Sequence, residues 1–171
     1  MATIPARISA ARGYFDGAQS DGLEEVDLPE VEFGTTEIGN MAVAGAVEVV
    51  DPADLMAMSA TFKFRALSPD VARALAPGRS VEVDVRIAVS DRDAATGAVA
   101  SRGNRAVLRC EAKKLTLPTI KRAQEDLLEV EVSVSYYRLV IDGVTLVEVD
   151  PLNFICVTDG VDRLAGLRSI L

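Results

Sequence analysis

Alternation of apolar and polar residues recurs along much of the chain and predicts β-strands. The clearest run covers residues 79–90, where valine or isoleucine occupies every second position from residue 81 and most residues between them are polar. Because successive side chains of a strand point to opposite faces, this run predicts a strand with one buried and one solvated face. Similar alternation at residues 56–65, 106–117 and 125–134 predicts three more strands.

Turn and capping residues predict how the strands connect. Asp142-Gly143 joins two β-rich runs and supplies the positive φ angles that a tight type I′ hairpin requires. Residues 68–78 predict one short helix that starts at the N-cap Ser68 and ends at Pro77-Gly78. The polar residues 91–104 predict a turn region between two strands.

Two other segments predict less regular structure. Residues 7–15 and 23–33 predict an N-terminal hairpin, with Pro29 confining its second arm to a sheet edge or a bend. Residues 136–141 are apolar on both faces, which is typical of a strand that crosses between sheets, carries a bulge or faces a neighbouring chain.

Residues 39–50 are apolar and rich in small residues, without a clear period. We predict that this segment docks on a neighbouring subunit, with residues 91–104 as a second candidate; a core strand at residues 46–50 is the alternative. The candidate contact residues are Met41, Ala42, Val43, Ala44, Val47, Val49, Tyr137 and Leu139.

Length and composition predict one domain over residues 1–171 that assembles with other chains. Hydrophobic residues make up 49% of the chain and mean hydropathy is +0.22, which is high for a soluble monomer with 26% charged residues. No apolar run is long enough to span a bilayer, and the start lacks the apolar region of a signal peptide. We therefore expect a chain that stays in the cytoplasm until it assembles and does not bind membranes stably.

No motif predicts catalysis, a metal site or a cofactor site. The chain has no histidine, which removes the usual histidine-activated nucleophiles. Its two cysteines, Cys110 and Cys156, form no CxxC pair and are predicted to be reduced and buried. The formal charge of −8 argues against stable binding of nucleic acid.

Two acidic pairs remain as candidate functional groups. Glu82 with Asp84, and Glu129 with Glu131, place carboxylates two positions apart on a strand and hence on one face, where such pairs can perform acid–base catalysis. Each pair alternates with valines, so solvated carboxylates are the better interpretation. Together they can set the charge of a surface.

The last third of the chain resembles a known family. The residues that carry the resemblance are Tyr137-Arg138-Leu139, Asp142-Gly143, Leu146-Val147-Glu148-Val149-Asp150, Asn153 and Gly160-Val161-Asp162-Arg163-Leu164. Weaker matches are Phe15-Asp16-Gly17, Leu28-Pro29, residues 39–45, Arg92-Asp93 and Thr96-Gly97. In this order the residues resemble the major tail tube proteins of contractile-tailed bacteriophages, although residues 115–126 depart from the family pattern.

The resemblance implies an all-β fold with one short helix, in which two packed antiparallel sheets form a tail-tube-type β-sandwich or barrel. It implies a structural protein rather than an enzyme, in a phage virion assembled in the host cytoplasm or in a tailocin. Hexameric rings would stack into a tube that DNA crosses without specific binding. The implied partners are further copies of the chain, the tail sheath protein, the baseplate or tube initiator, the tape measure and the tube terminator.

An acidic chain suits a lumen through which DNA must slide, because like charges remove the affinity for phosphates. We therefore predict that Glu82, Asp84, Glu129 and Glu131 help to line the lumen. Three alternatives stay open at this point: a type VI secretion tube, a monomeric β-barrel that binds a small ligand, and an enzyme that uses paired carboxylates.

Overall fold

The computed structural model describes residues 3–38, 45–93, 96–117 and 127–170, with side chains from residue 8 onward in these ranges. The elements follow one another as β1 (Thr3–Phe15), β2 (Ala18–Ser20), β3 (Leu23–Asp27), β4 (Phe33–Ile38), β5 (Val47–Leu55), β6 (Met58–Phe64), α1 (Pro69–Ala74), β7 (Ser80–Asp93), β8 (Val99–Thr116), β9 (Leu128–Ile141), β10 (Val144–Asp150), the 3-10 turn η1 (Pro151–Asn153), β11 (Ile155–Thr158), β12 (Val161–Asp162) and α2 (Ala165–Arg168).

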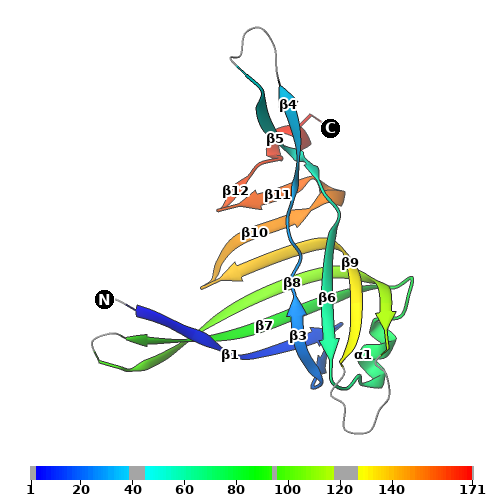
Figure 1. The fold of residues 1–171 in the computed structure, drawn as a ribbon, viewed down its shortest axis with the longest axis vertical. Coiled ribbons are helices and arrows are strands. Elements are labelled where there is room, and N and C mark those ends of the chain that lie inside the picture. Colours follow the sequence, from blue (N-terminus) through cyan, green and yellow to red (C-terminus); the bar gives the residue numbers. More distant parts are fainter. Residues whose placement is uncertain (1–2, 39–44, 94–95, 118–126, 171) are drawn as a thin grey trace.

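Most strands belong to one antiparallel sheet, which we call the large sheet, in the order β12-β11-β10-β9-β8-β7-β1-β2. The first half of β9 also pairs with β6, and β6 pairs with β3. Figure 1 shows that β3 and β6 run across one part of the large sheet as a second layer, the β3–β6 layer. The predicted all-β architecture of two packed antiparallel layers is confirmed.

The core lies between these layers. Phe15, Phe62 and Phe64 are fully buried, and the ring centroid of Phe15 lies 5.3 Å from that of Phe62 and 5.7 Å from that of Phe64. Valines that alternate along β7 and β9 surround these rings, which confirms the one-sided burial predicted for both strands. These valines are Val81, Val83, Val85, Val130, Val132 and Val134.

The predicted helix is present as α1 and closes one end of the core. The Ser68 hydroxyl accepts a hydrogen bond from the amide of Val71 at 3.4 Å, as an N-cap does, and Pro69 occupies the first turn. Val71 and Ala74 are buried. The helix thus presents its apolar side to the sheet.

The predicted N-terminal hairpin is wrong in its pairing. β1 pairs with β7 along most of its length, whereas β3 pairs with β6. A tight turn at Asp16-Gly17, with φ angles of 47° and 83°, instead joins β1 to the short β2. Alternation predicts that a segment is a strand, but it does not say which strand lies beside it.

The hairpin between β7 and β8 is also longer than predicted. β7 extends to Asp93 and β8 starts at Val99, so residues 99–104 pair with residues 87–92 instead of forming part of a turn region. Here alternation is lost because neither face of the projecting hairpin is packed in the core, so neither face requires apolar residues.

One long strand, β9, explains the apolar run at residues 136–141. Its register against β8 shifts between Arg109 and Cys110, which face Tyr136 and Val134. This bulge lets β9 pass from the β3–β6 layer into the part of the large sheet that pairs with β10. The strand ends at Asp142-Gly143, whose φ angles of 51° and 80° confirm the predicted tight turn.

Candidate assembly surfaces

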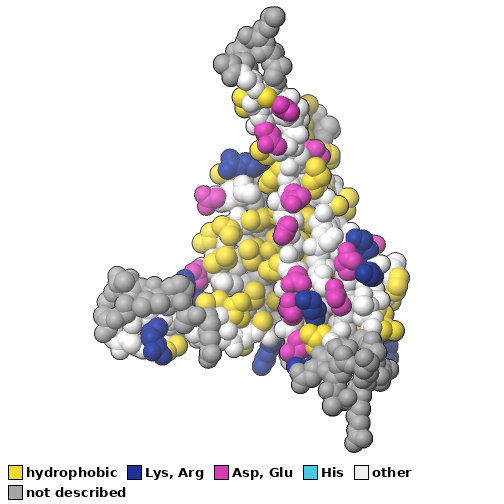
Figure 2. All heavy atoms as spheres, in the orientation of Figure 1, with side chains coloured by type: hydrophobic (Ala, Val, Ile, Leu, Met, Phe, Trp, Pro, Cys, Tyr) yellow, Lys and Arg dark blue, Asp and Glu magenta, His cyan; other side chains and the backbone are white. Residues whose placement is uncertain are grey.

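The β3–β6 layer covers only part of the inner face of the large sheet (Figure 1). On the uncovered part, Ile8 lies opposite Val89, and Leu139 lies opposite Val147. Figure 2 shows apolar side chains gathered on this side of the molecule, beside β3 and β6. We call this surface the open face, and its residues are Ile8, Ile87, Val89, Leu139, Ile141 and Val147.

The open face is the part of the hydrophobic core that the β3–β6 layer does not cover. Ile87, Leu139 and Val147 are partly buried and pack against core residues, whereas Ile141 is 37% and Ile8 64% exposed. Asn104 and Arg102 of β8 lie opposite Ile87 and Val89 on the same face, so the open face is apolar on both sides of a polar strip. Partly exposed apolar residues gathered on one face are typical of an interaction site. The sequence placed Ile87 and Val89 in the core, since alternation does not reveal where the covering layer stops.

A second surface is the hairpin of β4 and β5, which pair only with each other and form a separate two-stranded sheet. In Figure 1 this hairpin projects from one end of the molecule, beyond the large sheet. Val47 is 49% exposed, Val49 44% and Ile38 44%. An isolated two-stranded hairpin is marginally stable in water, so a partner that covers it would stabilise it.

The two faces of this hairpin differ in character. Glu37 lies opposite Glu48, so both acids share one face, while Ile38 lies opposite Val47 and shares the other face with Val49. The second of these, the valine face, is defined by Ile38, Val47 and Val49. The face with the two acids also carries Val50, which is 56% exposed, so the two faces of the hairpin differ in charge and both expose valine.

The candidate contact residues fall into different environments. Val47 and Val49 lie on the exposed hairpin, and Leu139 lies on the open face. Tyr137 is only 4% exposed and belongs to the chain's own core, because the β9 bulge turns its side chain inward. Met41, Ala42, Val43 and Ala44 lie outside the described residues.

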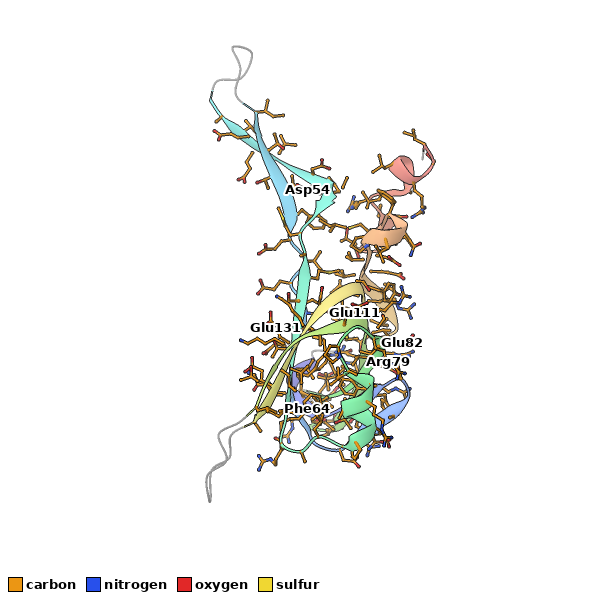
Figure 3. The ribbon with its side chains drawn as sticks, turned by 90° about the vertical axis from the view of Figure 1, so that its right-hand side faces the viewer. Asp54, Phe64, Arg79, Glu82, Glu111 and Glu131 are labelled. Atoms are coloured by element: carbon orange, nitrogen blue, oxygen red, sulfur yellow. The ribbon has the colours of Figure 1, made fainter. Side chains whose placement is uncertain are left out.

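The two acidic pairs lie on opposite sides of the molecule. Val83 of β7 and Val130 of β9 both point into the core, so the residues that alternate with them point outward. Because the sheet curls around the core, Glu82 and Glu131 emerge on opposite sides of it, with Phe64 between them (Figure 3). The four acids thus do not share one surface.

Asp84 is not a solvated carboxylate, which corrects the expectation from alternation. Its side chain is only 10% exposed and binds Arg105 at 2.7 Å and Arg86 at 3.0 Å. Desolvation acts to raise the pKa of Asp84, but hydrogen bonds from Arg105 and Arg86 outweigh it and hold the pKa below its usual value. Such a buried, doubly paired carboxylate has a structural role.

The other pair is more exposed and also partly neutralised. Glu129 is exposed, and Glu131 accepts a hydrogen bond from Lys113 at 2.8 Å. This hydrogen bond is the main cause that lowers the pKa of Glu131. Neither pair is arranged for acid–base catalysis, because in each pair one carboxylate is held by a basic side chain.

Arginines dominate the outer face of the large sheet beside Asp84. Arg12, Arg86 and Arg105 stand opposite one another on β1, β7 and β8, and the guanidinium carbon of Arg86 lies 4.6 Å from the centre of the Tyr14 ring. They border a hollow of about 600 Å³ with small residues at its floor. The large sheet is therefore not uniformly acidic on this side.

The acidic excess of the chain lies elsewhere. Residues 13–62 contain 11 of the 26 acidic residues and none of the 18 basic ones, which leaves 15 acidic and 18 basic residues in the remainder. This segment runs from the end of β1 through β2, β3 and the β4–β5 hairpin to Phe62 of β6. Part of this negative charge is neutralised by residues just beyond the segment, because Lys63 pairs with Glu25 and Asp27 and Arg65 pairs with Glu24.

The part of the chain that the structure describes offers no membrane-spanning helix and no metal site. No helix there is long and apolar enough to cross a membrane. Among the same residues, no group of three or more histidine, cysteine or acidic side chains is placed to hold a metal ion. Cys110 and Cys156 are both free and buried, as predicted.

Comparison with known proteins shows the family of the chain and its fold. A family model described as phage tail tube protein FII matches residues 5–171. Among solved structures, the fold is similar to a chain of the "PVC sheath-tube complex in extended state" of an extracellular contractile injection system, with a TM-score of 0.53 and 10% identity over 81% of this chain and 91% of that chain. No curated protein matches by sequence. Because the family model spans nearly the whole chain, the protein belongs to the phage tail tube protein FII family.

Proposed function

We propose that this tail tube protein forms hexameric rings that stack into the inner tube of a contractile phage tail or tailocin. The observation that carries the proposal is the open face, where the edge of the hydrophobic core lies in water. A subunit that buries this face against other copies gains apolar burial that the monomer lacks. The protein is then a component of the phage or tailocin particle, which is assembled in the host cytoplasm.

Within a ring, the large sheet of one subunit continues into that of the next. β2 pairs with β1 only at Gly13, Tyr14 and Phe15, so among the described residues the outer edge of β1 from residue 3 to residue 12 has no partner strand. Such an edge is a template for pairing with another chain, and closure into a ring removes it. The large sheets then form the wall of the tube.

The position of the β3–β6 layer supports one orientation of this wall. The inner face of the large sheet is occupied by the β3–β6 layer, so its outer face lines the lumen, together with Glu82 and Asp84. Glu129 and Glu131 then face the sheath, on the side of the molecule opposite Glu82. DNA then passes a wall of mixed charge, in which Asp84 neutralises part of the charge of Arg86 and Arg105.

Electron microscopy and size-exclusion chromatography of the purified protein at increasing concentration test the proposal. Hollow rings with six-fold symmetry, or stacked tubes, are the expected result. A monomer that fails to assemble, even with sheath and tube initiator proteins added, would overturn it. The tape measure and tube terminator complete the set of partners that the proposal requires, and each can be added in turn.

A pair of charge reversals tests the orientation of the wall. Glu82→Lys should change the rate of DNA ejection and leave assembly of the sheath intact. Glu131→Lys should weaken assembly of the sheath around preformed tubes and leave ejection unchanged in the particles that form. The opposite pattern would place the lumen on the β3–β6 side.

A further inference from the structure

We infer that a row of arginines on the outer face of the large sheet binds phosphate groups of the DNA that crosses the tube. The row consists of Arg12, Arg86 and Arg105, and the site is the hollow of about 600 Å³ that they border, which we call the arginine hollow. The inference rests on the proposed function, which turns this face toward the lumen. It gives the wall of the tube a ligand-binding site.

The shape of the arginine hollow follows from three small residues in the row beside the arginines. Ala10 lies opposite Ala88, and Ala88 lies opposite Gly103, two positions along each strand from an arginine and hence on the same face. All three line the hollow, and a Cβ at Gly103 would meet nothing within 4 Å. The guanidinium groups therefore stand beside a floor on which a ligand can approach the backbone closely.

The charge of the arginine hollow is positive. Three guanidinium groups and the one carboxylate that binds them, Asp84, leave a net charge of +2. Glu82 lies on the same outer face, but it does not line the hollow. The net charge of −8 on the whole chain acts weakly here, because charges more than about 10 Å away are largely screened at 0.1 M salt. The hollow therefore attracts anions although the chain is acidic.

Two of the arginines are held in place while part of each guanidinium group stays available. Asp84 accepts hydrogen bonds from Nε of Arg86 and from Nε and Nη2 of Arg105. Both side chains are nevertheless about half exposed, at 61% and 47%, and among the described residues the Nη atoms of Arg86 have no hydrogen-bond acceptor. Arg12 is exposed and has no described hydrogen bond or ion pair. Guanidinium groups that are fixed in position with donors still available suit bidentate binding of phosphate.

Phosphate of the DNA backbone is the anion that fits a tube of this kind. A duplex carries one negative charge per about 1.7 Å of its axis, so many phosphates pass each hollow. Contacts to phosphate carry no sequence information, which agrees with the passage of DNA of any sequence. A hexameric ring holds one arginine hollow on each subunit, so contacts that are weak singly act together. The expected result is a hold on DNA that salt weakens.

Thermal melting of the monomer with pyrophosphate tests the site without any need for assembly. An anion that binds the folded chain raises Tm with its concentration, and the series of melts gives a dissociation constant. Arg12→Gln should raise this constant about tenfold, because it removes a charged donor that no described residue uses. Gly103→Val should weaken binding by a similar factor, because it fills the floor of the hollow without changing any charge.

Arg73→Gln is the matched control for the melts. It removes the same charge from an exposed arginine on α1, which does not line the hollow, and should bind pyrophosphate as the unmodified protein does. Equal weakening by Arg12→Gln and Arg73→Gln would show attraction to the charge of the whole chain instead of a site, and would overturn the inference. Binding that Gly103→Val leaves unchanged, or a Tm that does not rise with pyrophosphate, would overturn it as well.

Sedimentation of preformed tubes with a fluorescein-labelled linear DNA duplex tests the site in the assembly. The duplex should sediment with the tubes at 50 mM salt and be released at 200 mM, because phosphate contacts are lost as salt rises. Tubes of Gly103→Val should retain about tenfold less of it. Closed circular DNA cannot thread into the tube and should stay in the supernatant.

The outcomes of this experiment separate the site from the proposed function. Circular DNA that sediments as the linear duplex does would place the phosphate site outside the lumen and overturn the inference. Retention of labelled poly-glutamate but not of the duplex would assign the hollow to an acidic protein segment, which also overturns it. Tubes that retain neither probe would overturn it and leave the tube function standing. If no tubes form, the proposed function and this inference are overturned together, before any DNA is added.

Discussion

The Arg105 guanidinium donates two hydrogen bonds to the Asp84 carboxylate, from Nε to Oδ1 at 2.7 Å and from Nη2 to Oδ2 at 3.0 Å. The two residues lie on neighbouring strands, β8 and β7, of the large sheet. Arg86 adds a third hydrogen bond to the same carboxylate. Without Asp84, three arginines that stand opposite one another across β1, β7 and β8 would repel with no adjacent carboxylate to offset them.

Asp84→Asn should therefore lower the free energy of unfolding by about 1–3 kcal/mol, because the amide cannot accept the charged hydrogen bonds of both arginines. Chemical denaturation of the protein at concentrations where it is monomeric measures this. Glu82→Gln is the matched control, since Glu82 is exposed on the same strand and should change stability by less than about 0.5 kcal/mol. Equal effects of the two substitutions would show that the buried pair adds no stability.

The stability of the unmodified protein should also depend on the charge of Asp84. Its pKa in the folded state is held below the ordinary value of 3.8, so the stabilisation is present above that value and is lost as pH falls through the folded pKa. The difference in unfolding free energy between the unmodified protein and Asp84→Asn should then be constant from pH 7 to 5 and shrink below pH 4. A difference that is the same at pH 3 and pH 7 would contradict the assignment.

Alternation and turn chemistry were sufficient to predict the strands of the core, the helix and its Ser68 cap, and the Asp142-Gly143 turn. These features depend on a local period or on a backbone angle, both of which the sequence carries directly. The pairing of β3 with β6 was missed, because no local pattern distinguishes one partner strand from another. The same limit explains why the sequence predicted a solvated Asp84 side chain, because the residue that covers it, Arg105, lies 21 positions away.

The candidate assembly residues show this limit most clearly. Val47 and Val49 are exposed on β5, so the subunit contact expected of them stays a prediction. Tyr137 was expected at a contact, and the bulge in β9 turned it inward. Ile87 and Val89 continue the period of the core valines, so only the extent of the β3–β6 layer reveals that they lie on the open face.

Gly22 should tolerate no side chain, because a Cβ at this position would lie 1.9 Å from the carbonyl oxygen of Ala66. The carbonyl of Gly22 also accepts a hydrogen bond from the amide of Arg65 at 2.8 Å, so the two segments cannot separate freely. Gly22→Ala should lower the free energy of unfolding by about 2 kcal/mol or more. Gly103→Ala, where a Cβ meets nothing within 4 Å, is the control and should be close to neutral in the same thermal melt.

Both cysteines should resist thiol reagents in the folded protein. Burial raises the pKa of the Cys110 thiol to about 12, with smaller contributions from Asp16 and Glu111, and it also raises the pKa of Cys156. At pH 8 a chromogenic disulfide reagent should therefore label neither thiol within an hour, and both at once after addition of denaturant. Rapid labelling of the folded protein would show that the large sheet opens near β8 or β11.

Arg102 should stabilise the base of the projecting β7–β8 hairpin. Its Nε donates to Asp91, which is 2% exposed, and its Nη1 donates to Asp142 in the β9–β10 turn. Arg102→Ala would leave the Asp91 carboxylate buried without a cation, which should lower the free energy of unfolding by about 3 kcal/mol or more. Asp142→Asn removes the charge of the exposed partner, keeps a residue type that tolerates the φ of 51° at this turn, and should cost less than about 1 kcal/mol. If both variants melt alike, the ion pair between Arg102 and the buried Asp91 does not hold this hairpin in place.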